Sequence, residues 1–149
     1  AAERHAFLSG GAEKLTLDYE GTDGADADGI KARLLESYAR DYETDLRLRY
    51  THTGPHKDDI KISVDGTDVR AFGSQGQQRT VSLSLKLAEL ALLTDVLGTS
   101  PVLLLDDVFS ELDSSRRKKL LTSLDGFQSI ITSTDSTDFD GFGVNVIYI

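Results

Sequence analysis

Cysteine, methionine and tryptophan are absent from this chain of 149 residues, and it contains only two prolines. Without cysteine the chain has neither a disulfide framework nor a thiolate metal site, which fits a reducing cytoplasm. No apolar run approaches the roughly 18 residues that indicate a membrane-spanning helix, and the polar N-terminus lacks the apolar core of a signal peptide. We therefore expect a cytoplasmic protein that makes no use of a membrane.

Basic side chains are also scarce, with 16 Lys and Arg against 25 Asp and Glu and a formal net charge of −9. Because binding to phosphates needs clustered Lys and Arg, we do not expect this chain to carry the main nucleic-acid contact surface. Residues 116–119 form a local basic run, and Arg47 and Arg49 share one face of a predicted strand. Such side chains are most often simply solvated, and any DNA contact here would be partial.

Apolar periodicity predicts alternating structure along the chain. In the first half it predicts a strand at 15–19, an acidic loop at 20–28, an amphipathic helix from 30 to about 45 and a strand at 46–50. A strand at 60–64 then reaches a tight turn at Asp65-Gly66 that leads to Val69 and Phe72. In the second half it predicts a helix at 80–97, a strand at 102–105, a helix at 114–124 with Asp113 as N-cap, and strands at 128–132 and 144–148. This order predicts a parallel α/β core with an antiparallel or mixed extension before it.

The strand at 102–105 ends in two adjacent carboxylates, Asp106 and Asp107. A continuous apolar run is typical of a strand buried on both faces of a parallel sheet. Open α/β sheets bind ligands at the carboxyl ends of their strands. One carboxylate there can hold Mg²⁺ through water and the next can orient and deprotonate an attacking water. An ordinary acidic turn after a strand is an equally good explanation of the pair alone.

The segment Ser74-Gln75-Gly76-Gln77-Gln78-Arg79 precedes the helix predicted at 80–97. Ser74 and Gln77 have the spacing of a capping box, so the segment is explained by a well-formed helix start. The free N–H groups of a helix N-terminus, with a serine hydroxyl and a glycine that allows close approach, also suit an anion. Both explanations hold together.

The order of these segments resembles an ABC-type ATPase: SQGQQR as signature loop, the strand with its acidic pair as Walker B, and Ser110-Glu111-Leu112-Asp113 as D-loop. Together with Gly54-Pro55-His56-Lys57-Asp58-Asp59, they closely resemble the bacterial RecF family of recombination mediators. The resemblance is dense from about residue 54 to 135. It implies the C-terminal part of a P-loop NTPase fold, with an N-terminal extension at 1–53, belonging to the family's arm region, and an ATPase core at 54–149.

The resemblance also implies roles for single residues. Asp106 would bind Mg²⁺ through water, and Asp107, where most ABC-type ATPases have glutamate, would polarise the attacking water. Asp113 would lie at a dimer interface. Ser133 falls near the switch position that is usually histidine. The signature loop would contact ATP bound by a second subunit through Ser74, Gln75, Gly76 and Gln77. His56 and the pair Asp58-Asp59 have no role that we derive beyond a structural turn.

The phosphate-binding motif G-x-x-x-x-G-K-[ST] occurs nowhere in the chain. A P-loop NTPase grips the phosphates with that loop and its lysine, and Gly10-Gly11-Ala12-Glu13-Lys14 lacks both the spacing and the hydroxyl residue. In the RecF family this Walker A loop lies in the N-terminal part. We therefore expect this chain to be the C-terminal portion of a longer protein and to be inactive by itself.

The RecF resemblance implies ATP and Mg²⁺ as cofactors, an ATP-dependent homodimer, and DNA and other recombination mediators as partners. It further implies a role in DNA replication, recombinational repair and the SOS response, including recombinase loading at single-strand gaps. An SMC-like ATPase head is an alternative, although no sustained heptads are present. A non-catalytic interaction domain on an ABC-like scaffold is another alternative, and a Walker A motif upstream would separate it from an ATPase.

Overall fold

The computed structural model describes residues 1–21, 26–110, 112–134, 139 and 141–148. Much of the acidic loop predicted at 20–28, and Glu111 of the D-loop-like segment, lie outside these residues. The chain divides into two units, one made of residues 1–16 and 63–149 and the other of residues 17–62. The boundary near residue 53 that the sequence suggests stays a prediction.

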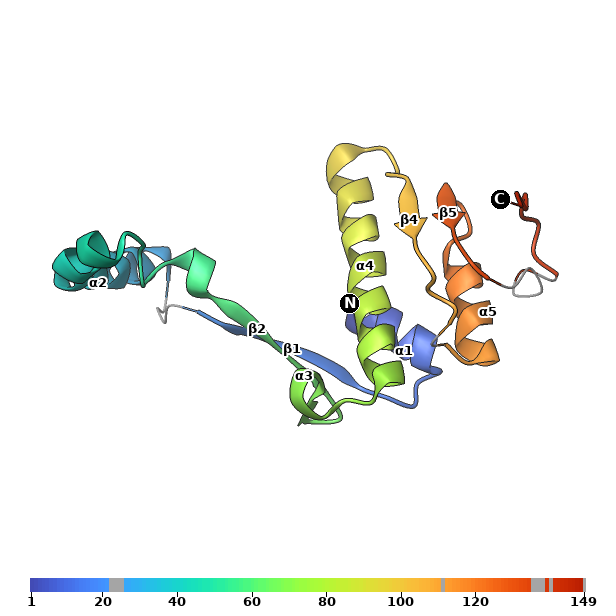
Figure 1. Cartoon of the computed structure of the whole chain (residues 1–149), viewed down its shortest axis with the longest axis horizontal. Coiled ribbons are helices and arrows are strands. Elements are labelled where there is room, and N and C mark those ends of the chain that lie inside the picture. The colour runs from blue at the N-terminus through green and yellow to red at the C-terminus, as the bar shows by residue number, and fades with distance from the viewer. Residues whose placement is uncertain (22–25, 111, 135–138, 140, 149) are drawn as a thin grey trace. The chain divides into compact units, whose positions relative to one another are not determined.

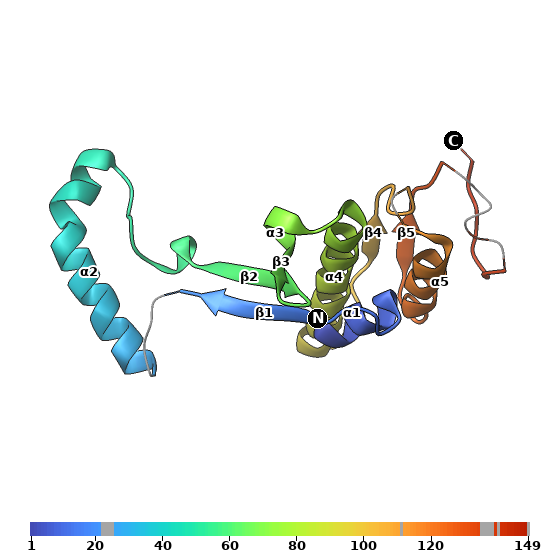
Figure 2. The same cartoon turned by 90° about the horizontal axis from the view of Figure 1, so that it is seen from below.

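The larger unit contains a parallel β–α–β arrangement (Figures 1 and 2). Strand β4 (Leu103–Leu105) and strand β5 (Ser129–Ile131) pair in parallel, with Leu103 opposite Ser129 and Leu105 opposite Ile131. Helix α5 (Ser114–Ser123) connects them, and helix α4 (Gln75–Leu97) precedes β4. These elements confirm the predicted α/β fold with a parallel sheet.

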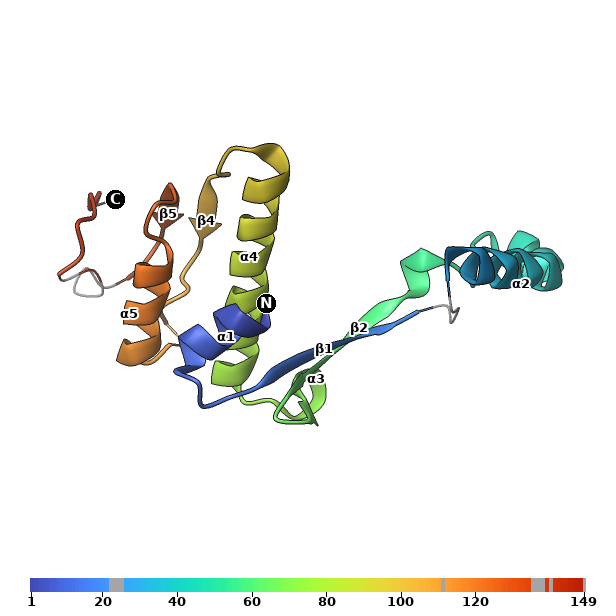
Figure 3. The ribbon, with the colours of Figure 1, turned by 180° about the vertical axis from the view of Figure 1, so that it is seen from behind.

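Helix α1 (Ala2–Ser9) was not predicted, because its sequence shows no clear apolar stripe. It packs against both α4 and α5 (Figure 3). Leu8 and His5 are its buried side chains. The first residues of the chain therefore belong to the same core as the two helices from its second half.

The core of this unit is almost entirely aliphatic, with Phe109 and Leu120 fully buried between helices and sheet. It consists of Leu8, Leu83, Leu87, Leu90, Leu103, Leu105, Val108, Phe109, Leu112, Leu120, Leu121 and Leu124. Strand β4 is buried on one face only, which corrects the prediction of burial on both faces: Leu104 is 70% exposed. The described residues cover only one side of the sheet, and Leu104 and Ile130 on its other side are uncovered within this chain.

A second sheet has the strand order β1 (Leu15–Glu20), β2 (Asp59–Val64), β3 (Thr67–Asp68). Strands β2 and β3 are antiparallel and are joined by the predicted turn, in which Asp65 and Gly66 have φ values of 51° and 80°. The antiparallel strands expected around this turn are present, but the second strand ends at Asp68 and does not reach Val69 and Phe72. Asp68 instead caps helix α3 (Val69–Phe72) by accepting a hydrogen bond from Ala71 N–H, which ends the strand.

The smaller unit contains helix α2 (Ala27–Leu48) and the 3-10 helix η1 (Pro55–Lys57). The strand predicted at 46–50 was wrong, because α2 continues to Leu48 and Arg49 ends it with φ of 60°. Tyr42 and Leu46 are four residues apart, so they fit one helix face as well as the start of an alternation. A strand also needs a partner for its backbone groups, whereas a helix satisfies its own.

The segment Gly54–Asp59 forms the structural turn that we expected. Gly54 has φ of 139°, a conformation open to glycine, and His56 Nε2 lies 2.9 Å from the carbonyl of Thr51. The hydroxyl of Tyr19 contacts the carboxylate of Asp58, which ties the turn to β1. These contacts hold the turn in one conformation.

The strand predicted at 144–148 is also wrong, because residues 141–148 have no regular secondary structure. Val144, Val146 and Tyr148 are all exposed, and without strand pairing their alternation lacks the backbone hydrogen bonds that make a strand. Within the described ranges, no helix has both the length and the apolar character needed to cross a membrane.

Candidate functional site

Thr132 joins the two carboxylate residues that follow β4. Its hydroxyl donates a hydrogen bond to Asp106 Oδ1 at 2.5 Å and accepts one from Asp107 N–H at 2.9 Å. Thr132 N–H donates to the carbonyl of Leu105 at 3.0 Å, which extends the β4–β5 pairing by one step. Asp106, Asp107 and Ser133 therefore lie at the carboxyl edge of the parallel sheet, as the sequence predicts.

The backbone of Asp107 is held in the left-handed region, with φ of 46°. Its N–H is bound by Thr132 and its carbonyl accepts a hydrogen bond from Ser110 Oγ at 3.0 Å. Such a conformation is uncommon in a non-glycine residue and persists where neighbouring contacts hold it, often at functional sites. Both contacts use the main chain, so the exposed carboxylate of Asp107 stays available for chemistry.

The oxygen ligands at this edge suit Mg²⁺, which prefers carboxylates and retains several waters. The Thr132 contact uses one oxygen of the Asp106 carboxylate. Among the described residues, no group of three or more His, Cys, Asp or Glu side chains is arranged to hold a metal ion. The second oxygen of the Asp106 carboxylate is the atom at this edge that could contact a hydrated cation.

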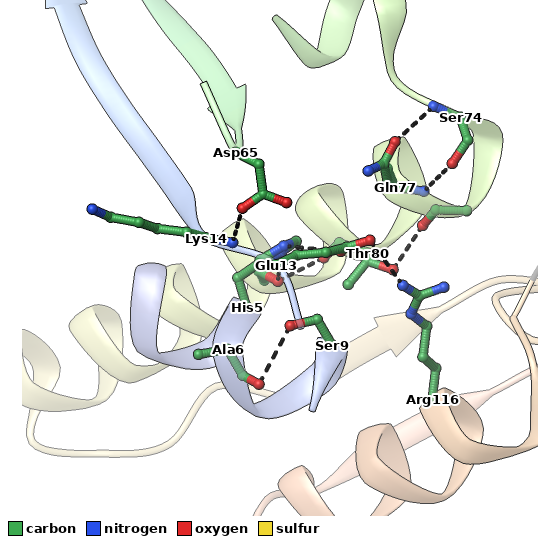
Figure 4. Close-up of polar contacts among 12 residues, drawn as sticks. His5, Ala6, Ser9, Glu13, Lys14, Asp65, Ser74, Gln77, Thr80 and Arg116 are labelled. Atoms are coloured by element: carbon green, nitrogen blue, oxygen red, sulfur yellow. Dashed lines mark hydrogen bonds and ion pairs between the residues drawn. The ribbon is translucent and has the colours of Figure 1, made fainter. Parts of the chain in front are cut away.

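The start of α4 carries the second set of predicted residues, Ser74 to Gln77. Ser74 Oγ accepts a hydrogen bond from Gln77 N–H at 3.2 Å, and Gln77 Oε1 accepts one from Ser74 N–H at 3.0 Å (Figure 4). This is the predicted capping box. The proton of the Ser74 hydroxyl is not used by the cap, so exposed Ser74 can still donate it to an anion.

Asp113 caps α5 as predicted, accepting a hydrogen bond from Arg116 N–H at 2.9 Å. This backbone hydrogen bond is the main cause that lowers the pKa of the Asp113 carboxyl below its ordinary value. Arg116 Nη1 lies 3.4 Å from Asp113 Oδ2, and a Cβ placed on Gly76 would lie 3.6 Å from the same nitrogen. The guanidinium therefore lies between the start of α5 and the start of α4.

Sequence reasoning missed Thr132 and Arg116. A polar residue directly after the next parallel strand is a signal that could have indicated Thr132, because strand ends meet at one sheet edge. We expected Arg116 to be solvated with the rest of the basic run, but its side chain is only 24% exposed and pairs with Glu13 and Asp113. Its spacing of three residues from Asp113 was the available signal.

The chain is similar over most of its length to curated proteins named "DNA replication and repair protein RecF". It is 50% identical over 135 residues to the one from Agathobacter rectalis, covering 91% of this chain and 36% of that protein. It is 44% identical over 144 residues to the one from Synechocystis sp., covering 94% and 38%. The chain thus spans little more than a third of the length of these relatives. No family model matches it.

Two solved structures share its fold. A structure of the recombination mediator protein RecF-ATPrS in the RecFOR pathway has a TM-score of 0.70 at 40% identity, covering 91% of this chain and 38% of that one. The corresponding RecF-ATP structure has a TM-score of 0.64 at 40% identity, with the same coverage.

A parallel sheet edge with an acidic pair, beside capped helix starts, defines part of a P-loop NTPase fold of the ABC-ATPase type. By sequence and by fold, the chain is similar to a C-terminal segment of proteins named "DNA replication and repair protein RecF".

Proposed function

We propose that this chain is the segment of a RecF-like ATPase that supplies the catalytic carboxylate and the trans-acting signature loop. The longer protein binds ATP and Mg²⁺, dimerises when ATP is bound, and hydrolyses ATP to release the dimer. With DNA and other recombination mediators as partners, it acts in replication and recombinational repair by helping to load recombinase at single-strand gaps. The names of the two similar structures, RecF-ATPrS and RecF-ATP, support the choice of nucleotide.

The observation that carries this proposal is the joint support of Asp106 and Asp107 by one threonine hydroxyl. Two neighbouring carboxylates held at a sheet edge can divide two tasks between them. Asp106 would anchor Mg²⁺ through water, and an ion bound there would supply positive charge to offset that of the phosphates. Asp107 orients the attacking water and accepts its proton.

The capped start of α4 supports a role toward a second subunit. The Ser74 hydroxyl donates a hydrogen bond to the terminal phosphate of a nucleotide held by that subunit. The N–H groups near Gln75 and Gly76 face the same anion. Gln77 keeps Ser74 in place through the capping box. Asp113 lies at the dimer interface, and Ser133 occupies the switch position beside the strand edge.

Replacing Thr132 with valine in the full-length protein should reduce steady-state ATP hydrolysis about tenfold, as expected for losing a hydrogen-bond partner that orients catalytic groups. Valine has nearly the same shape but leaves Asp106 without its donor and Asp107 N–H without its acceptor. The measurement is phosphate release at saturating Mg-ATP. Thr132→Ser keeps the hydroxyl and is the matched control. Equal activity in the valine and serine variants would contradict this support role.

The isolated 149-residue chain should fold, and its dissociation constant for Mg-ATP should lie far above the micromolar range. Its sequence has no G-x-x-x-x-G-K-[ST] loop, whose N–H groups and lysine supply much of the phosphate contact in such ATPases. Calorimetric titration with Mg-ATP measures the binding. Circular dichroism checks that the isolated chain is folded. A micromolar dissociation constant would show that this segment alone forms the nucleotide site.

A further inference from the structure

A network of polar side chains connects α1, α4 and α5. Arg116 Nη2 lies 3.2 Å from Glu13 Oε1, and Glu13 Oε2 lies 3.2 Å from His5 Nε2. His5 Nδ1 is 3.3 Å from Ser84 Oγ on α4. These contacts run from the D-loop-like helix start to the middle of α4, all within the larger unit (Figure 4).

The same network is connected to the signature loop through Thr80. Ser84 Oγ donates a hydrogen bond to the carbonyl of Thr80 at 2.6 Å, and Thr80 Oγ1 donates to the carbonyl of Gly76 at 2.7 Å. Arg116 itself lies beside Gly76. Gly76 is therefore tied through its carbonyl to Thr80, and the Arg116 guanidinium lies near it, since a Cβ placed on Gly76 would lie 3.6 Å from Arg116 Nη1.

The order serine, histidine, glutamate in this network is that of a nucleophilic triad, but its burial excludes that use. His5 and Ser84 are both 0% exposed, and the Ser84 hydroxyl donates to a backbone carbonyl. Burial lowers the pKa of His5, although the contact with Glu13 acts in the opposite direction. His5 Nε2 and Glu13 Oε2 lie close together but make no hydrogen bond, so the hydrogen bonds that order this network are those of Arg116 with Glu13 and of Ser84 with Thr80.

Electrostatics explains why Arg116 needs two carboxylates. A cation beside the N-terminus of α4 is repelled by the positive end of the helix macrodipole. Glu13 and Asp113, one on each side of the guanidinium, offset that repulsion. The position of Arg116 beside Gly76 thus depends on both acidic partners.

From this network we propose that Arg116, anchored by Glu13, is a positioning residue that holds the D-loop residue Asp113 and, by filling the space beside Gly76, fixes the spacing between the D-loop and the signature loop. This inference rests on the proposed function, in which both loops meet a nucleotide held by a second subunit. Fixing them together lets one subunit present both contacts at once without reordering either loop. Arg116 acts through these residues and need not touch ATP.

The test uses the full-length protein with the variants Arg116→Gln and Glu13→Gln. We expect each to weaken ATP-dependent dimerisation about tenfold or more by sedimentation or light scattering, while ATP binding to the monomer changes less than about twofold. Because the two residues act as a pair, the double variant should dimerise no more weakly than the more affected single variant. Lys118→Gln, which removes the same charge from an exposed position on α5, is the matched control and should behave as the unaltered protein.

Hydrogen exchange and thermal melting separate positioning from simple stability. In Arg116→Gln we expect faster exchange of backbone amides around Gly76 at temperatures well below the melting transition. A variant that only melts earlier and still dimerises normally overturns the inference, as does additive behaviour in the double variant. If the unaltered protein fails to dimerise with ATP, the proposed function fails instead, and this inference fails with it.

Discussion

Replacing Asp107 with asparagine in the full-length protein should lower ATP hydrolysis by about a hundredfold or more, the effect expected from removing a positioned base. ATP binding should survive, so the variant should accumulate as an ATP-bound dimer. Asparagine keeps the size of the side chain and tolerates left-handed backbone, so it should retain φ near 46°. The contacts of the Asp107 main chain with Thr132 and Ser110 should remain as well.

The measurements for Asp107→Asn are phosphate release at saturating Mg-ATP and the dimer fraction by light scattering. Asp95→Asn is a matched control, because Asp95 is exposed near the far end of α4 and the substitution makes the same change of charge. Turnover equal to that of the unaltered protein would assign the catalytic carboxylate to another residue. A loss of ATP binding would instead show that Asp107 contributes to nucleotide binding rather than to activation of the attacking water.

Replacing Ser74 with arginine in the full-length protein should abolish ATP-dependent dimerisation while leaving ATP binding to each monomer nearly intact. Ser74 is exposed at the start of α4. In the proposed trans arrangement, a long cation there should obstruct the approach of a second subunit and leave the phosphate loop expected upstream in the same monomer unaffected. The substitution also removes the cap on Gln77 N–H, which costs about 1 kcal/mol of stability. Light scattering with and without ATP, beside a thermal melt, measures the two effects separately.

Two further variants separate obstruction from loss of the cap. Ser74→Ala removes the same cap without the bulk, and it should lower the melting temperature as much as Ser74→Arg does. Ser82→Arg adds the same cation to an exposed position further along α4 and should dimerise normally. If Ser74→Arg still dimerises with ATP and is only less stable to heat, Ser74 is a helix cap and the trans-acting assignment fails.

Local rules predicted the parts of the candidate site that depend on neighbours in the sequence. The capping box of Ser74 and Gln77, the cap that Asp113 places on α5, and the turn at Asp65-Gly66 all involve residues within four positions of each other. The parallel sheet edge at Asp106 was also predictable, because an apolar strand must end at a polar edge. The order of these segments carried the resemblance to the RecF family, which similarity to known proteins then confirmed.

Long-range contacts decided the rest, because spacing along the sequence does not specify which distant side chains meet. The sequence by itself determined the capped starts of α4 and α5, the main strands and the acidic pair, because each depends on backbone hydrogen bonds and side chains close along the chain. Only the tertiary structure brought Thr132 to Asp106, 26 positions away, and Glu13 to Arg116, 103 positions away. It also decided that the pattern at 46–50 continues a helix and that β4 is covered on one face, since pairing and burial depend on which elements meet in space.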